Sequence, residues 1–522
     1  MKKILFLIIA GLLILALVAL PGCGGGEQEE EEEEEPGVIY TFEDGEIVLG
    51  IAGEVGHATG DMAKLGATLA VNGINGAGGI DIDGVTHNFV LQVVDTKEVQ
   101  DETGESGTTA MEAAVDDVDF FMGGFRTEAL EVYRDVAMDA EKIFFDCGAA
   151  TEHLSQSCVT DYDTYKYWFK TTPYNEYFLA SSVLRLVDMT AIKIREALGL
   201  AADANLDACI IAEDLEWSRD ELVPKLEAGL PGLDITNLET YLVSSLDPVS
   251  TQGAVADVDA NYDPHIIIPI YSGTMGVYYS GTLLSYIGAG ALGSMSVGIN
   301  VYEQFKAPWA AKIAAAPPDG PYCMFHVLLD TWADGVAQSS TTLPFLTAFM
   351  TYASGEYPMY TAATYDACFM LQACLEDVGY VEDGVGKAKA NDIIAWLEDP
   401  DNAIPTTTGQ NSVYPPITGG KLTEAQVKSF YDIASYGYTY NAADWATPPH
   451  TTHDLAYGPE WAHGVGCQWQ WDSAAGQWKK FGVWPAEVAG ADLVDQYGDW
   501  NFEFPGTKDL ILPTWVVGHF GS

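Results

Sequence analysis

The sequence predicts an α/β fold with two lobes, each built on a doubly wound, mostly parallel sheet. Residues 46–96 read as strand, glycine-rich loop, helix and strand, which is a βαβ unit. Apolar strands and helices then go on alternating in two separate blocks of the chain. Several of these strands are apolar without a break, as parallel strands covered on both faces are.

The opening unit begins with a short apolar run at residues 46–52, as a buried strand requires. A glycine-rich loop follows, and Thr59 or Asp61 can cap the next helix. Apolar side chains at helical spacing define that helix: Met62, Leu65, Leu69 and Ile74. Residues 76–79 end it, and residues 89–96 form the second strand. The loop lies at the carboxyl end of the first strand, where open α/β sheets bind ligands.

The same patterns predict the later elements. In the first block we expect helices near 108–115 and 128–140 and strands at 119–124 and 142–145. In the second block we expect strands at 208–212 and 265–270 and helices near 218–228 and 276–287. Helices around 342–352 and 360–377, an extra loop at 400–440, and a hairpin with strands 466–471 and 478–484 follow.

The N-terminus has the pattern of an export signal. Two lysines precede an apolar run at residues 4–20, which is slightly short for a membrane-spanning helix. Leu20 to Cys23 resemble a bacterial lipobox, so we expect a signal peptide at 1–23 and a lipid on Cys23. An uncleaved N-terminal anchor is the alternative. Seven consecutive glutamates, Glu29 to Glu35, predict an extended acidic tether at 24–45.

The composition is strongly acidic, with 23 Lys and Arg against 76 Asp and Glu and a net charge of −53 at pH 7. Such a surface repels nucleic acid and anionic headgroups, so we expect no nucleic-acid partner and membrane contact only through the lipid. The excess runs along the whole chain, which leaves two explanations open. It reflects either a salty habitat, where screening relieves the self-repulsion, or ordinary solubility at the cell surface.

Five segments together resemble a known family of binding proteins. They are IVLGIAG…TG…GATLAVNGINGAGGI…VLQVVDT, FFMGGFRTEA, CGAATEHLS, GEYPMYTAATYDA and THDLAYGPEWAHGVGCQWQ, spread over residues 46–485. Their order and spacing are similar to those of the substrate-binding proteins of branched-chain amino acid ABC importers. The resemblance implies the type I periplasmic-binding fold, with two lobes joined by a multi-strand hinge. It also implies an extracytoplasmic monomer that serves ABC permease subunits, with no enzymatic activity and no cofactor, and the lipobox pattern predicts that this monomer is lipid-anchored.

The resemblance also divides the chain into lobes. It implies crossings between the lobes near 167–173, 324–329 and 440–460. Lobe 1 is then residues 46–170 plus 326–445, and lobe 2 is residues 171–325 plus 446–518. Two other functions stay open at this point: a ligand-sensing lipoprotein with the same lobes, and a secreted hydrolase that uses a pair of acids.

The candidate anion half of the binding site follows two strands of the first lobe. Arg126 and Thr127 sit at a strand's carboxyl end and open a helix, where backbone N–H groups favour an anion. The Arg126 guanidinium suits a carboxylate, although it could instead pair with a neighbouring acid. The resemblance implies that the main chain of Ala149 and the hydroxyl of Thr151 hold the ligand's α-carboxylate.

The other half of the site comes from the second lobe. The resemblance places Trp217 over the ligand; the alternative is an aromatic that packs only on its own lobe. Tyr271 and Ser272 follow the 265–270 strand and face the cleft in this interpretation, and His57 in the first loop is a further ligand contact. The family's ammonium-binding glutamate is matched in position by Asn300. This difference makes an amide, a urea derivative or a plain carboxylate an alternative to an α-amino acid.

Other motifs are weaker. Residues 288–293 match GxGxxG, but a helix precedes and a strand follows, so we expect a turn and no nucleotide. His450, His453 and His463 lack a supporting cysteine or second HxxH motif, so no metal site is predicted. Cys147 and Cys158 bracket one loop and are a candidate disulfide in an oxidising compartment.

Overall fold

The computed structural model describes residues 39–42, 45–304, 325–379, 387–412, 414, 453–459, 461–487, 494–495, 498–500 and 504–521. The predicted signal peptide with Cys23, residues 24–38, His450 and most of the 400–440 loop lie outside the described residues. Within the described residues, no helix combines the length and the apolar character needed to cross a membrane. The predicted tether ends earlier than residue 45, because β1 (Ile39–Thr41) pairs with β13 (Lys387–Lys389).

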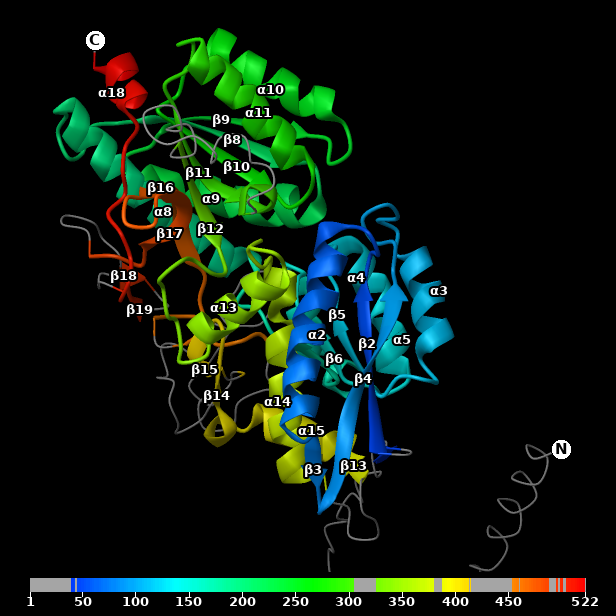
Figure 1. Cartoon of the computed structure of the whole chain (residues 1–522). Helices are drawn as coiled ribbons and strands as arrows, with labels where there is room; N and C mark the ends of the chain where they lie inside the picture. The colour runs from blue at the N-terminus through cyan, green and yellow to red at the C-terminus, as the bar shows by residue number, and fades with distance from the viewer. Residues whose placement is uncertain are drawn as a thin grey trace, which may run out of the picture. The chain divides into compact units, whose positions relative to one another are not determined.

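The first lobe is centred on a six-stranded sheet with the order β3-β4-β2-β5-β6-β7. Its strands are β2 (Glu46–Gly53), β3 (Ile80–Ile82), β4 (Val85–Asp95), β5 (Phe120–Gly123), β6 (Phe144–Asp146) and β7 (Trp168–Lys170). Neighbouring strands pair in parallel, except for the antiparallel pair β3 and β4. The helices of this lobe include α2 (Ala58–Ala77), α3 (Glu105–Ala114), α4 (Thr127–Tyr133), α5 (Asp135–Asp139), α6 (Glu152–Thr160) and α14 (Thr364–Val378) (Figure 1).

The predicted βαβ unit is confirmed, with a different cap. The side chain of His57, and not that of Thr59 or Asp61, accepts a hydrogen bond from the Thr59 N–H at the start of α2. The helix ends at Gly78, whose φ of 122° is rare for a residue with a side chain. The unit therefore ends where the glycine cluster predicts.

The second lobe is centred on a seven-stranded sheet with the order β17-β16-β12-β11-β10-β8-β9. Its strands are β8 (Asp207–Glu213), β9 (Asn237–Val243), β10 (Ile266–Tyr271), β11 (Met295–Asn300), β12 (His326–Asp330), β16 (Val465–Asp472) and β17 (Gln477–Trp484). The first five pair in parallel, and the hairpin β16–β17 joins β12 antiparallel. The turn predicted at 288–293 separates α11 (Met275–Gly288) from β11.

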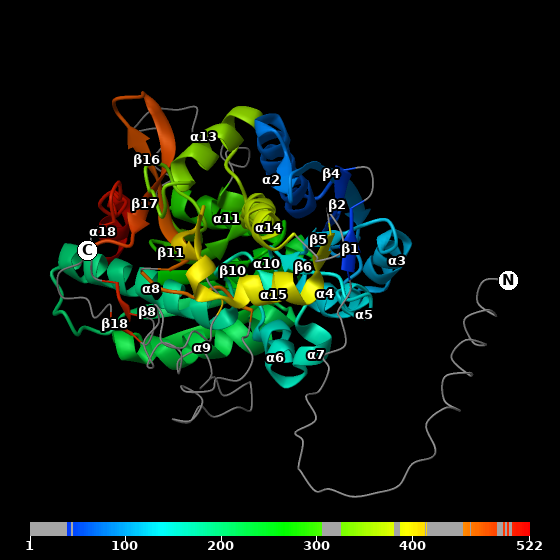
Figure 2. The ribbon, with the colours of Figure 1, turned by 90° about the horizontal axis from the view of Figure 1, so that it is seen from below.

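The continuous apolar strands of this lobe are covered on both faces, as predicted. Ile266, Ile268 and Ile270 belong to a core shared with α8 (Glu176–Leu198) and α9 (Val223–Gly229), whereas Ile267 packs with α10 (Pro248–Asn261) and α11. Figures 1 and 2 show these two helix pairs on opposite sides of the sheet. Successive side chains of a strand point to opposite faces, so a strand buried on both faces has no polar alternation.

The chain crosses between the lobes after β7, after β12 and before β16. The second crossing lies later than predicted, because β12 pairs with β11 and β16 and so keeps residues 326–330 in the second lobe. The crossing segments bind one another: the hydroxyls of Tyr174 and Thr331 are 2.8 Å apart, and Gln338 Nε2 donates to the carbonyls of Thr331 and His463. The predicted multi-strand hinge is thus a hydrogen-bonded bundle.

The predicted disulfide between Cys147 and Cys158 is wrong, because both thiols are free and buried. Cys147 Sγ accepts a hydrogen bond from the Thr171 hydroxyl, and Cys158 Sγ donates to the Tyr165 carbonyl. Burial raises the pKa of both thiols. They therefore serve as small core residues.

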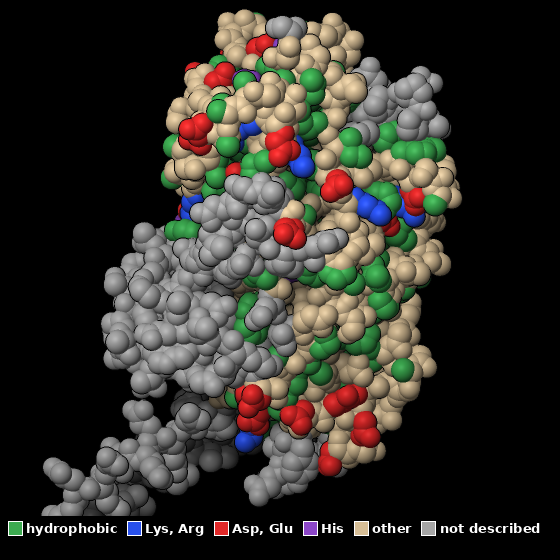
Figure 3. Space-filling model, turned by 90° about the vertical axis from the view of Figure 1, so that its left-hand side faces the viewer, with side chains coloured by type: hydrophobic (Ala, Val, Ile, Leu, Met, Phe, Trp, Pro, Cys, Tyr) green, Lys and Arg blue, Asp and Glu red, His purple; other side chains and the backbone are tan. Residues whose placement is uncertain are grey.

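Acidic side chains are spread over the described surface. Figure 3 shows Asp and Glu side chains scattered over one face, among apolar and neutral polar ones. This distribution agrees with an acidic excess that runs along the whole chain.

Candidate ligand-binding site

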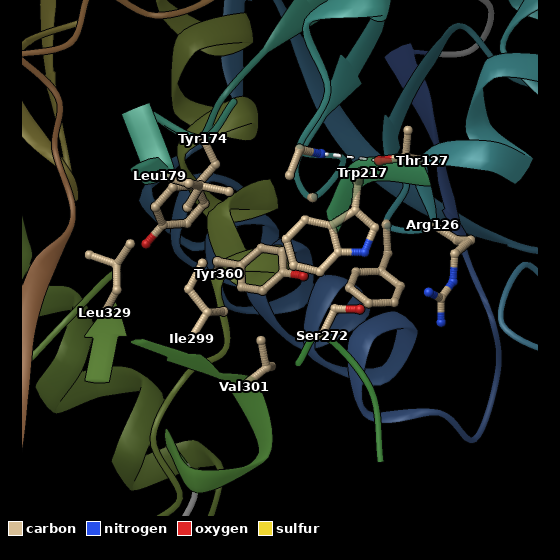
Figure 4. A pocket seen from close by; sticks show the side chains of 13 residues that line it. Arg126, Thr127, Tyr174, Leu179, Trp217, Ser272, Ile299, Val301, Leu329 and Tyr360 are labelled. Carbon is tan, nitrogen blue, oxygen red and sulfur yellow. Dashed lines mark hydrogen bonds between the residues drawn. The ribbon is translucent and has the colours of Figure 1, made fainter. Parts of the chain in front are cut away.

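A cavity lies between the two lobes, at the carboxyl ends of the parallel strands. Its walls are Phe125, Arg126, Thr127, Gly148, Ala150, Tyr174, Leu179, Trp217, Ser272, Ile299, Val301, Leu329 and Tyr360 (Figure 4). The space open to the centre of a water molecule is about 40 Å³. That is room for only a few waters, so a ligand of many atoms requires the walls to move apart.

Arg126 is the charged residue of the described wall. It is the N-cap of α4, it is 2% exposed, and its Nε and Nη1 atoms have no hydrogen-bond partner. Its Cζ lies 5.4 Å from the centre of the Phe125 ring. A buried cation without an acceptor is costly, so this guanidinium is suited to receive an anion.

Two buried carboxylates lie near Arg126 and hold the loops of the site in place. Glu98 Oε2 accepts hydrogen bonds from the N–H groups of Phe125 and Arg126 (3.0 and 3.1 Å) and from the Tyr133 hydroxyl. Burial raises the pKa of Glu98 to about 7, against the lowering effect of these hydrogen bonds and of Arg126. Glu98 therefore fixes the backbone that presents Arg126.

Glu213 does the same for the second lobe. Its carboxylate accepts hydrogen bonds from the Ser272 N–H (2.9 Å), the Ser272 hydroxyl (2.7 Å) and the Gly273 N–H (3.1 Å). Burial raises the pKa of Glu213, and the nearby Arg126 guanidinium and these hydrogen bonds oppose the rise. The Ser272 hydroxyl is thereby oriented at the cavity wall.

Four of the predicted site residues line the cavity: Arg126, Thr127, Trp217 and Ser272. Thr127 Oγ1 accepts a hydrogen bond of 3.3 Å from the Ala150 N–H, which ties the loops after β5 and β6 together (Figure 4). Arg126, Thr127 and Ser272 could be predicted because they follow the ends of predicted strands, and Trp217 could be predicted from the family resemblance.

The other predicted residues of the first lobe lie outside the cavity wall. The Ala149 N–H donates to Asp146 Oδ1 (3.0 Å), and Thr151 Oγ1 caps α6 by accepting from the His153 N–H (3.3 Å). Ala150, which lies between them, lines the cavity instead. His57 stands between the Thr59 hydroxyl (2.8 Å from Nδ1) and the Tyr302 hydroxyl (3.2 Å from Nε2).

In the second lobe, Tyr271 and Asn300 also lie outside the wall. Tyr271 packs on Tyr279 in the core, with ring centres 5.2 Å apart. Asn300 Nδ2 donates to the Gly276 carbonyl (3.1 Å) and the Ser280 hydroxyl (3.0 Å). The residues beside Asn300, Ile299 and Val301, line the cavity instead, because side chains alternate between faces.

Several wall residues were not predicted from the sequence. Tyr360 belongs to the turn η7 (Tyr360–Ala363), against which α2 packs closely: a Cβ on Gly66 would meet the Ala362 carbonyl at 2.3 Å. Tyr174 lies in the first crossing, and Leu329 near the second. The sequence does hold clues to them: Tyr174 and Leu329 lie in or next to the predicted crossings, and Tyr360 lies in the segment GEYPMYTAATYDA, which resembles the family.

One cluster of possible metal ligands occurs among the described residues, formed by Glu131, His153 and Glu216 with ligand atoms within 4.8 Å of one another. Hydrogen bonding to Glu131, with the charges of Glu221 and Glu216, raises the pKa of His153 to about 9. At neutral pH the imidazole is thus protonated and bridges acids of the two lobes.

The histidines weighed from the sequence are engaged elsewhere. His453 Nδ1 lies 2.6 Å from the Trp168 carbonyl and its Nε2 lies 2.8 Å from Glu398 Oε1. His463 Nδ1 lies 2.7 Å from the Gly464 carbonyl.

Comparison with known proteins shows the fold. No family model and no curated protein matches the chain. The isoleucine complex of the branched-chain amino acid transporter substrate-binding protein LivJ from Streptococcus pneumoniae is 17% identical and covers 70% of this chain and 94% of its own, with a TM-score of 0.51. The structure of a putative branched-chain amino acid ABC transporter from Silicibacter pomeroyi is 16% identical, with a TM-score of 0.55. The match covers 90% of this chain and 99% of that one.

A third similar structure holds another kind of ligand. The solute-binding protein of an ABC transporter from R. palustris, in complex with benzoate, is 13% identical and covers 84% of this chain and 96% of its own, with a TM-score of 0.51. The chain therefore has the type I periplasmic-binding fold of ABC-transporter substrate-binding proteins. At these identities, the likeness extends to the fold and not to the ligand.

Proposed function

We propose that this protein is the lipid-anchored, extracytoplasmic substrate-binding component of an ABC importer. It captures an amino acid or a related small carboxylate or amide between its lobes and delivers it to permease subunits as a monomer. It binds the ligand without changing it chemically. The observation that carries the proposal is the interlobe cavity with the buried Arg126 in its wall, whose Nε and Nη1 atoms have no hydrogen-bond partner.

The mechanism rests on contacts that need both lobes. Arg126 and Thr127 come from the first lobe, and Trp217 and Ser272 come from the second. A ligand that touches both sets stabilises the closed arrangement by its difference in affinity for the closed and open states. The hydrogen-bonded hinge allows the lobes to move as units, and the closed form is the one that docks.

The ligands of the structural neighbours support this range of chemistry. Two of the similar structures are complexes with isoleucine and with benzoate, which share a carboxylate and an apolar body. The cavity of this chain offers the same two features, an anion-binding group and apolar walls.

A thermal-shift screen against amino acids, amides and small carboxylates tests the proposal. We expect at least one of these classes to raise the melting temperature, and calorimetry to give one site per chain without loss of the compound. A screen without any stoichiometric binder would contradict the proposal. Turnover of a bound compound would instead support a hydrolase.

A further inference from the structure

We infer that the cavity takes an apolar monocarboxylate that has no ammonium group, and discriminates against the α-amino acid with the same side chain. The inference rests on the proposed function, because it concerns the ligand of the same cavity. The described wall offers hydrogen-bond donors that suit a carboxylate, and it offers no acid that could pair with an ammonium.

The wall presents donors for a carboxylate. The Nε and Nη1 atoms of Arg126 have no partner, although the residue is 2% exposed. Thr127 Oγ1 already accepts from the Ala150 N–H, so its own proton remains available for the ligand. A carboxylate can accept from both groups, and it gives the buried Nε and Nη1 atoms the hydrogen-bond acceptor that they lack.

The described wall presents no acid for an ammonium. The two carboxylates near Arg126, Glu98 and Glu213, are not part of the wall. They accept hydrogen bonds from main-chain N–H groups of the loops after β5 and β10. The Ser272 hydroxyl donates its proton to Glu213 and keeps only lone pairs for the ligand. An ammonium has three donors and a tight water shell, and one neutral acceptor cannot replace that shell.

The rest of the wall is apolar or aromatic. Leu179, Ile299, Val301 and Leu329 supply aliphatic groups, and Phe125, Tyr174, Trp217 and Tyr360 supply rings. Figure 4 shows Tyr174 near Leu179 and Leu329 at one end of the pocket, Tyr360 and Trp217 in the middle, and Arg126 at the other end. Among the described wall residues Arg126 is the sole cation, so a second carboxylate on the ligand would be unpaired. The ligand is therefore a monocarboxylate with a branched or aromatic body.

Calorimetry with matched pairs tests the inference: 4-methylpentanoate against leucine, and 3-phenylpropanoate against phenylalanine. We expect at least one acid to bind roughly tenfold or more tightly than its amino-acid partner, since an unpaired buried charge is costly. If the amino acids bind as well as the acids or better, the inference fails while the proposed function stands. If neither member of any pair binds at millimolar concentration and the wider screen also fails, both fall.

A pair of charge-matched variants tests the role of Arg126. Arg126→Gln should weaken binding of the acid by about tenfold to a hundredfold. Arg219→Gln is the control, because Arg219 is 40% exposed, pairs with Asp214 and Asp220, and lies outside the cavity wall. Unchanged affinity in the folded Arg126→Gln protein overturns the inference.

A ligand variation keeps the test decisive if Arg126→Gln does not fold. With the unaltered protein, 4-methylpentanamide should bind roughly tenfold more weakly than the acid, because it lacks the charge that Arg126 attracts. Equal affinity for the amide and the acid would contradict the assignment of Arg126 as the carboxylate anchor.

Discussion

The buried ion pair beside the second crossing offers a sharp test of what stabilises the fold around the hinge. Lys480 on β17 and Asp330 at the end of β12 contact each other with both side chains 0% exposed. The Lys480 ammonium also lies 4.6 Å from the centre of the Tyr357 ring. Asp330 further accepts hydrogen bonds from the N–H groups of Thr331 and Trp332. Lys480→Met would leave this carboxylate buried without its cation.

Removing one partner of such a pair costs about 3–5 kcal/mol of unfolding free energy. Burial already raises the pKa of Asp330, and Lys480 opposes this rise. Without Lys480 the folded-state pKa goes further above the unfolded value. At low pH, Asp330 is protonated in both the folded and the unfolded state, so its titration does not lower the free energy of unfolding of the variant. That free energy falls as the pH rises through the folded-state pKa of Asp330. We therefore expect Lys480→Met to lose more unfolding free energy, relative to the parent protein, at pH 8 than at pH 5.

Urea unfolding followed by tryptophan fluorescence measures the effect. Lys479→Met is the matched control, because Lys479 is the neighbouring residue and pairs with Asp472 at 2.8 Å while 29% exposed. That pair should contribute only about 0–1 kcal/mol. Lys480→Met combined with Asp330→Asn should recover much of the loss. A deficit below about 1 kcal/mol for Lys480→Met, or one equal to the control, would refute the reasoning.

Three further predictions follow from the site and the chain's N-terminus. His153→Gln should remove a pH dependence of the interlobe contact: the His153 pKa is raised from 6.5 to about 9, so its stabilisation is complete below about pH 6.5 and is lost as the pH rises through 9. Trp217→Ala should weaken ligand affinity and compaction together in small-angle scattering, since Trp217 is a wall residue. Cys23→Ser should release the protein from membranes, because the acidic tether has no affinity for anionic headgroups.

Each of these has a contrary outcome. If the melting temperature of the His153→Gln variant depends on pH between 6.5 and 9 as that of the parent does, His153 is not the cause of this pH dependence. An unchanged radius of gyration when the parent is saturated with ligand would exclude hinge closure. Retention of the Cys23→Ser variant in salt-washed membranes would exclude the lipobox.

Local patterns in the sequence are sufficient to predict many of the strands and helix ends. Ile266 to Ile270 are apolar at every position, which predicts a strand covered on both faces, and the structure confirms it. The glycines at 76–79 predict the end of α2, because only a residue without a side chain readily adopts the φ of Gly78. Such signals depend on neighbours in the chain and can be read from the sequence.

Part of the site was also accessible in this way. Ser272 follows β10 directly and Arg126 lies three residues after β5, and parallel strands end at the same edge of a sheet. The sequence alone does not show which of several adjacent residues has its side chain in the cavity wall. Asn300 was predicted from its position, but Ile299 and Val301 line the cavity, because the strand's register decides which face each side chain meets.

Only the tertiary structure decided the remaining features. Tyr360 enters the cavity wall because Gly66 lets α2 pack against a turn almost 300 residues away in the chain. Cys147 and Cys158 are free and buried, and their thiols contact different groups, Thr171 and the Tyr165 carbonyl. The Nε and Nη1 atoms of Arg126 lack a hydrogen-bond partner in a chain with 76 acidic residues, because the nearby Glu98 and Glu213 accept from main-chain amides. The sequence by itself determined the strands and the edge of the sheets where ligands bind, since these follow from local periodicity. The charge balance of the cavity depends on long-range contacts, which no local pattern contains.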